Sequence, residues 1–245
     1  MRHGNRMNAR YFLLVASLSM AAWMLAPLAA AQSSEQNRYY IQQMIELATT
    51  NDDHGVTTTQ RVLEQSPKPA SADPSGARAA SQRGLAALEQ NELETALRAF
   101  QQASQADPGN VEAVNYLGLI YRKLNRFQEA ENALQQALAL EPTRAVAWFQ
   151  LAQVYGLQND ARRALGALAN TYRFAQNPMR AEEILRNIAE NEAADTLRNA
   201  ALETLRLYRL PVEAVIVPPL PANPGIAPLN VPPGSVRAPS IRPAP

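Results

Sequence analysis

The sequence predicts an all-α fold of stacked helical hairpins, and three observations lead to this prediction. Residues 77–178 contain three copies of one pattern of residue types at a constant spacing. Within the copies, packing residues recur at i, i+3, i+4 and i+7, a spacing that places them on one face of a helix. Prolines close the first two copies at Pro108 and Pro142, where they prevent a helix from continuing. Each copy is therefore predicted to form two helices joined by a turn.

The aligned positions of the repeat have mechanical roles within each predicted hairpin. In the third copy, one face of the first helix carries Trp148, Leu151, Ala152 and Tyr155, and the second copy has Val114, Leu117, Gly118 and Tyr121 in the same places. Small residues allow two helices to approach closely. On the first helices they are Gly84, Gly118 and Ala152, and on the second helices Ala96, Ala130 and Ala164. Larger residues align at Phe100, Leu134 and Leu168.

Asparagines mark the predicted turns inside the hairpins. Each copy has one at the same place, namely Asn91, Asn125 and Asn159. Because asparagine tolerates the left-handed backbone conformation that ends a helix, all three are predicted to be helix stops. After the closing proline, Asn110 or Thr143 is expected to cap the next helix.

A period of about 34 residues built from two helical stripes resembles the tetratricopeptide repeat family. The resemblance implies a right-handed α-solenoid of three tetratricopeptide helical hairpins with C-terminal capping helices, flanked by flexible segments. Its repeats would span residues 77–110, 111–144 and 145–178. The repeats cover less than half of the chain.

The N-terminal residues 1–31 have the features of an export signal. A basic start with Arg2, Arg6 and Arg10 precedes an apolar run from Tyr11 to Leu28, and three alanines follow as a cleavage site. An exported bacterial protein in the periplasm is expected. The alternative is an uncleaved inner-membrane anchor, because about 18 mostly apolar residues approach the length that spans a bilayer. The chain has no cysteine, which excludes disulfides, thiolate metal sites and lipid attachment at a cysteine.

Residues 32–76 are predicted to be a short helix followed by a flexible linker. The amphipathic stretch 35–47 carries Tyr40, Ile41, Met44 and Ile45 on one side. It is expected to pack on the first repeat, with a separate contact or self-association helix as the alternative. Residues 49–76 are polar and rich in threonine, serine and proline, a composition that does not order itself.

Beyond the third repeat the spacing changes. Gln176 stands where proline is expected, and Pro178 follows two residues later. Asn177 and Pro178 are predicted to start another helix. Residues 179–210 are predicted to be capping helices or a degenerate fourth repeat. The tail 211–245 contains 11 of the 18 prolines, so we expect a disordered spacer or, alternatively, a polyproline ligand for a partner.

Charge and composition argue against nucleic acid binding and against catalysis. Without the three arginines of the export signal, 20 basic residues face 22 acidic ones, a net charge of −2 that does not favour nucleic acid. His54 is then the remaining histidine, in the run from Asn51 to Gly55. One histidine beside two aspartates could belong to a metal site, but such a run is more often a solvated loop. We expect no enzyme activity, no cofactor and no metal.

The resemblance implies a concave groove on the first helices that takes up a protein or peptide. Positions of the first helices that do not pack against the second helices predict its residues. The main candidates are Arg78, Leu85, Leu88, Asn115, Leu119, Arg122, Val146, Phe149 and Gln153, with Ser81, Glu112 and Gly156 beside them. The alternative is that several of them pack against the N-terminal helix or the linker.

Some family members hold a terminal carboxylate with cationic side chains on this face. The matching positions here are Ser81, Leu85, Tyr116, Val146 and Gln150, and none is cationic. An apolar or extended peptide is therefore the expected ligand. The sequence predicts an adaptor or scaffold for an envelope assembly or secretion complex, with a membrane-anchored spacer as the alternative. It does not predict the oligomeric state.

The predicted signal can be tested directly on exported protein. Cleavage after Ala31 would leave Gln32 as the first residue, because signal peptidases cut after small residues. N-terminal sequencing of the chain purified from its native host is expected to begin at Gln32. A sequence beginning at Met1 or Arg2 would contradict cleavage and support the anchor.

Overall fold

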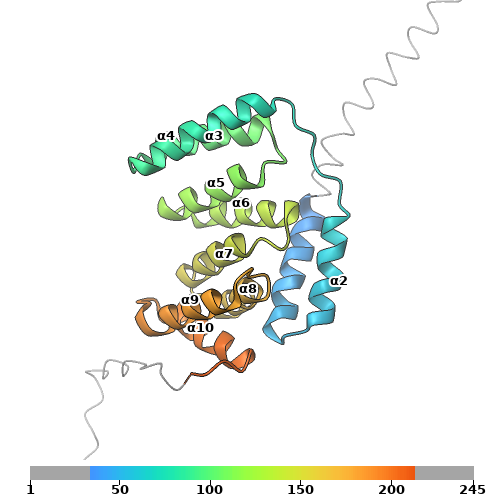
Figure 1. The fold of residues 1–245 in the computed structure, drawn as a ribbon, viewed down its shortest axis with the longest axis vertical. Helices are drawn as coiled ribbons and strands as arrows, with labels where there is room; N and C mark the ends of the chain where they lie inside the picture. The colour runs from blue at the N-terminus through green and yellow to red at the C-terminus, as the bar shows by residue number, and fades with distance from the viewer. Residues whose placement is uncertain (1–33, 213–245) are drawn as a thin grey trace, which may run out of the picture. The chain divides into compact units, whose positions relative to one another are not determined.

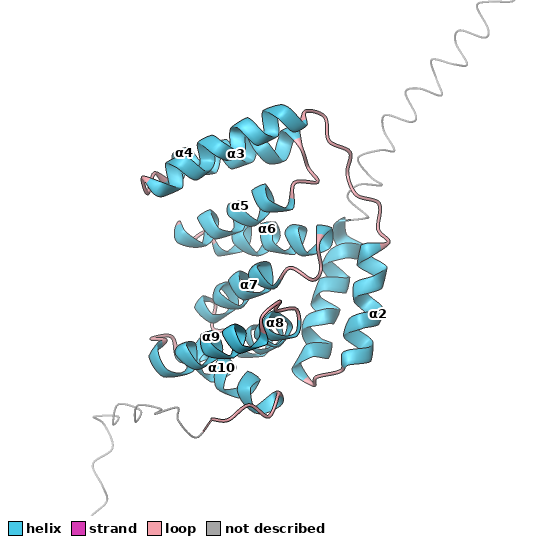
Figure 2. Cartoon of the chain, viewed as in Figure 1, coloured by secondary structure: helices cyan, strands magenta, loops and turns pink. Residues whose placement is uncertain are grey.

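The structure is a computed structural model that describes residues 34–212. The predicted export signal, residues 1–31, lies outside the described residues, as does the proline-rich tail apart from its first two residues. The described residues contain helices and no strand (Figure 2). None of the helices between residues 34 and 212 is both long enough and apolar enough to cross a membrane.

Eight of the helices form four hairpins that follow one another in chain order (Figure 1). The first three hairpins are α3 (Pro74–Glu89) with α4 (Leu93–Ala106), α5 (Val111–Lys123) with α6 (Phe127–Leu140), and α7 (Ala145–Leu157) with α8 (Ala161–Arg173). The fourth is α9 (Pro178–Asn191) with α10 (Asp195–Leu207). The helices of each pair pack together, and consecutive hairpins also contact each other. The predicted all-α fold of stacked hairpins is confirmed.

The turn signals of the repeat are largely confirmed. Asn91, Asn125 and Asn159 have φ values of 58°, 57° and 60°, and each stands at the turn between two paired helices. Asn110 caps α5 by accepting a hydrogen bond from the Ala113 N–H at 3.0 Å. The expected cap at Thr143 is wrong, because α7 begins after Arg144 and no side chain accepts at its N-cap.

Two glycines let the paired helices touch. A Cβ atom on Gly84 would lie 2.6 Å from Cε2 of Phe100, and one on Gly118 would lie 2.5 Å from Cγ of Leu134. Both distances are shorter than carbon atoms tolerate, so each glycine faces the large residue of its own second helix. This contact accounts for the alignment of small and large residues in the repeat.

Part of the predicted linker is a helix. Residues 53–64 form α2 (Asp53–Glu64), which is capped by Asp52 through a 2.9 Å hydrogen bond from the Gly55 N–H. Its buried residues Val56, Thr59 and Leu63 lie on one face. The expectation of a flexible linker over residues 49–76 is therefore wrong for this segment. The polar composition of α2 does not prevent its packing, because only the face with these three residues is buried.

The N-terminal helix, residues 34–49, packs beside α2 and against the third hairpin (Figure 1). The side-chain amide of Asn170 on α8 donates to the Met44 carbonyl oxygen at 3.2 Å. Ile41, Met44 and Ile45 are fully buried. The expected packing of this helix is confirmed, but its predicted position on the first repeat is wrong. Gly166 explains why the N-terminal helix packs on the third hairpin, since this glycine leaves room on α8 for the backbone of Ile45.

A buried polar cluster joins the N-terminal helix to three others. The Tyr155 hydroxyl on α7 donates to Glu131 of α6 at 3.2 Å and accepts from Gln42 at 3.2 Å. Arg163 of α8 donates to the same Glu131 oxygen at 2.8 Å, and its guanidinium lies 4.3 Å from the centre of the Tyr155 ring. Burial, together with the Glu131 charge, raises the pKa of Tyr155 to about 12.

The fourth hairpin departs from the packing of the first three. α10 packs on both α7 and α8, whereas α9 packs mainly on α10. Gly156 of α7 makes room for this contact, because a Cβ atom there would lie 2.8 Å from the Leu197 Cβ of α10. Asn177 caps α9 and Pro178 occupies its first turn, as predicted.

Replacing Gly166 by alanine should loosen the N-terminal helix. The new Cβ would lie 2.2 Å from the Ile45 carbonyl oxygen, and a backbone atom cannot move aside alone. We expect the free energy of unfolding to fall by about 1–3 kcal/mol, although alanine favours helix over glycine. Hydrogen exchange of residues 34–49 should accelerate. Gly118→Ala is the control, since its clash with Leu134 lies inside the second hairpin. Equal exchange of residues 34–49 in both variants would contradict this packing.

The Tyr155 cluster predicts a pH dependence of stability. With a folded-state pKa of about 12 against an ordinary value of 10.0, the folded chain keeps the phenol proton longer than the unfolded chain. The stabilisation is complete below pH 10 and is lost as the pH rises through 12. The free energy of unfolding, compared with that of Tyr155→Phe, should fall by on the order of 2 kcal/mol between pH 9 and pH 12. Parallel curves for the two proteins would show that the hydroxyl is not buried.

Candidate protein-binding groove

The first helices α3, α5 and α7 carry the predicted groove residues, and the structure divides these by exposure. Arg78, Leu85 and Val146 are exposed, and Val146 reaches 54%. The side chains that are partly buried are Leu88, Leu119, Arg122, Phe149 and Gln153. Exposed and half-exposed apolar side chains thus occur on all three first helices.

A hollow of about 250 Å³ lies between α3 and α5. Arg78, Ser81 and Leu85 line it from α3, and Glu112 and Tyr116 line it from α5. The Tyr116 ring stacks on Phe100 at a centroid distance of 4.8 Å, which fixes one wall. The structure therefore brings four of the predicted side chains together here, namely Arg78, Ser81, Leu85 and Glu112.

A second hollow of about 460 Å³ lies between α7 and α9. Val146 and Phe149 line it from α7, and Ala181 and Ile184 line it from α9. Phe174, in the loop after α8, adds a further aromatic wall. The floor of this hollow is apolar, with charged groups on its rim.

Arg144, between the two hollows, forms two ion pairs through its terminal nitrogens. The Arg144 guanidinium donates to Glu141 at 3.0 Å and to Glu112 of α5 at 3.3 Å. Arg144 also precedes α7 directly. These pairs tie the starts of α5 and α7 together, so the two hollows belong to one surface formed by first helices.

Two predicted groove positions are not available to a partner. Asn115 is only 4% exposed, and its Oδ1 has no hydrogen-bond partner among residues 34–212. Gly156 packs against Leu197. Arg122 is half-buried, and this burial lowers the pKa of its guanidinium. The prediction placed Asn115 and Gly156 in the groove because helical spacing does not show how far a neighbouring helix covers each position.

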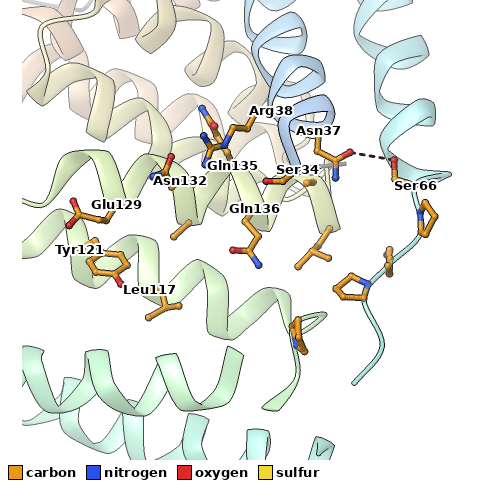
Figure 3. A pocket seen from close by; sticks show the side chains of 17 residues that line it. Ser34, Asn37, Arg38, Ser66, Leu117, Tyr121, Glu129, Asn132, Gln135 and Gln136 are labelled. Atoms are coloured by element: carbon orange, nitrogen blue, oxygen red, sulfur yellow. Dashed lines mark hydrogen bonds between the residues drawn. The ribbon is translucent and has the colours of Figure 1, made fainter. Parts of the chain in front are cut away.

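The N-terminal helix forms no side-chain hydrogen bond with the predicted groove residues among residues 34–212. Its side-chain hydrogen bonds with the hairpins go to Tyr155, Arg162 and Asn170, none of which is a predicted groove residue. A larger hollow of about 770 Å³ lies beside this helix (Figure 3). Asn37, Tyr121, Asn132 and Gln136 are among its lining side chains, and the segment 66–69 forms its outer wall. The sequence could not indicate this hollow, because its wall depends on a segment expected to be a linker.

The cluster around His54 lies at the start of α2. Asp52 caps the helix through the Gly55 N–H, and Asp53 pairs with Arg173 of α8. His54 itself is exposed. Across residues 34–212, no three histidine or acidic side chains gather closely enough to hold a metal ion. Helix capping and an ion pair account for both aspartates.

The groove prediction missed the residues of α9. Arg180, Ala181 and Ile184 line the second hollow, whereas the sequence predicted capping helices or a degenerate fourth repeat there and no groove residue. Asn177 and Pro178 indicated where α9 begins, but nothing in the sequence indicated that α9 faces α7 across a hollow.

Several known proteins are similar to this chain. Residues 87–150 match the family model described as "Tetratricopeptide repeat". A solved structure of MamA is 23% identical, with a TM-score of 0.45, and the match covers 66% of this chain and 92% of that one. Another MamA structure is 22% identical over 75% of this chain and 99% of that one, with a TM-score of 0.45. No curated protein sequence matches.

An enzyme also occurs among the similar structures. A mutant of Thermobaculum terrenum O-GlcNAc transferase is 22% identical, with a TM-score of 0.44 over 57% of this chain. The chain spans only 28% of that transferase. These TM-scores say nothing about what the chain binds or does. The family match, together with the helical hairpins, supports a scaffold for protein–protein interactions. The residues that match the tetratricopeptide model, 87–150, lie within the segment 77–178 whose spacing predicted this repeat.

Proposed function

We propose that the chain is a non-enzymatic adaptor whose first-helix surface holds segments of other proteins. One observation carries this proposal. The N-terminal helix packs on the α8 side of the third hairpin through Asn170 and Gly166, while the first helices keep two hollows and exposed apolar side chains. A surface with apolar floors and a few polar groups suits a partner that anchors side chains in pockets.

The proposed location is the periplasm, in an envelope assembly or secretion complex. The basic start, the apolar run and the three alanines of residues 1–31 support export. The absence of cysteine from the whole sequence is compatible with an oxidising compartment. A scaffold with two separate hollows on one surface could hold two partners, or two segments of one partner.

Photo-crosslinking in the native host tests this function. A photoreactive amino acid is placed at Leu85 and, separately, at Val146, because both side chains are exposed. Arg98 on the outer helix α4 is the control position, since it is also exposed. We expect discrete crosslinked proteins from the two groove positions and none from Arg98.

A second variant pair checks that the crosslinks report specific binding. Leu85→Asp and Val146→Asp each replace an exposed apolar side chain of a hollow by a charge. For proteins that are crosslinked from both groove positions, each aspartate variant should lower the crosslinking yield from the other groove position by about tenfold. Both side chains point to solvent, so thermal unfolding should be nearly unchanged. Identical crosslinks from Leu85, Val146 and Arg98, or yields that both variants leave intact, would contradict the proposed groove.

A further inference from the structure

The hollow between α7 and α9 has a defined chemical preference. Its floor is formed by Val146, Phe149 and Ile184. Val146 is 54% exposed and Ile184 is 37% exposed, so apolar surface faces solvent from both walls. Its volume of about 460 Å³ lies in the range of roughly 300–1,000 Å³ that is typical of ligand pockets. One large apolar side chain of a partner would fit and would exclude water from both walls.

The rim of the same hollow carries two arginines, one of which has no ion pair within the described part of the chain. Its charged lining residues are Glu141, Arg144 and Arg180. Arg144 already pairs with Glu141 and Glu112. On the adjacent α9 turn, Glu182 pairs with Arg186, and no carboxylate of residues 34–212 forms a salt bridge with Arg180. Arg180 is exposed and therefore available to a carboxylate from outside.

The position of Arg180 in its helix supports a role outside helix stability. α9 begins at Pro178 after the Asn177 cap, so Arg180 is the third residue of the helix. A positive charge in the first turn opposes the helix dipole, and glutamate at this position would complete a capping box with the cap residue. Arginine here costs helix stability, and no ion pair within residues 34–212 offsets this cost.

We infer that this hollow binds a short protein segment in which one large apolar side chain is flanked by aspartate or glutamate. The apolar side chain occupies the floor between Phe149 and Ile184, and the flanking carboxylate pairs with Arg180. The inference rests on the proposed function, because it assumes that the first-helix surface holds a protein, and it adds the chemical class of the partner segment.

Selection from a phage-displayed library of random twelve-residue peptides tests this inference on the full chain. The wild-type chain should enrich peptides in which leucine, phenylalanine, methionine or tryptophan lies beside Asp or Glu. For such a peptide, Arg180→Glu should weaken binding at least about tenfold, and Val146→Asp should do the same. The affinity should also fall as salt rises, since the paired charges lie at the surface.

The charge change has a matched control. Arg98→Glu carries the same change on the outer helix α4, where the arginine is exposed, and it should leave peptide affinity within twofold of wild type. Arg180→Glu should also select a different set of peptides, enriched in lysine and arginine. Thermal unfolding of Arg180→Glu should not occur at a lower temperature than that of wild type, because glutamate suits the first turn of α9.

Three outcomes would overturn the inference. Peptides that lose binding with Leu85→Asp but not with Arg180→Glu or Val146→Asp would leave the proposed function standing and show this hollow to be unused. A concentration-dependent dimer of the chain that Val146→Asp abolishes would identify a second copy as the occupant. A selection that yields no peptide above background would contradict both the inference and the proposed function.

Discussion

The close contact between the two helices of each hairpin is the constraint on which the rest of the structure depends. At Gly84 and Gly118 there is no space for a Cβ atom, because Phe100 and Leu134 occupy it. This contact sets the distance between paired helices, and the distance in turn sets which side chains are buried in the shared apolar interior. Since the same contact recurs at the same interval along the chain, the hairpins stack with similar geometry, and equivalent positions of successive first helices come to lie on one surface.

The N-terminal helix covers the α8 side of the third hairpin, so the proposed binding surface is the one formed by the first helices. The N-terminal helix contacts α8 through Asn170, Gly166 and Arg162, and it contributes Gln42 to the cluster around Tyr155. Four helices therefore meet around one tyrosine. The hairpin of the N-terminal helix and α2 fills space that a partner would otherwise need. The first-helix surface keeps its hollows, with exposed apolar side chains at Leu85 and Val146.

Local chemistry could be predicted from the sequence, whereas contacts between distant segments could not. Asn91, Asn125 and Asn159 end helices because of a property of asparagine itself, and the period of the repeat predicted the hairpins. Gly166 and Ile45 lie far apart along the chain, so no periodicity links them. The helix α2 was missed because Val56, Thr59 and Leu63 are few apolar positions in a polar segment. The burial of Asn115 likewise depends on a neighbouring helix.

The second hollow lies where the packing of the hairpins changes, which distinguishes it from the first. In the second and third hairpins, the first helix packs against the second helix of the preceding hairpin, which closes most of the space between them. In the fourth hairpin α9 packs mainly on α10, and α10 contacts α7 through Leu197 and Gly156. Val146 and Phe149 of α7 line the hollow between α7 and α9, and Val146 stays exposed. The apolar hollow therefore lies at the junction where the packing of the hairpins changes, and not within the three regular hairpins.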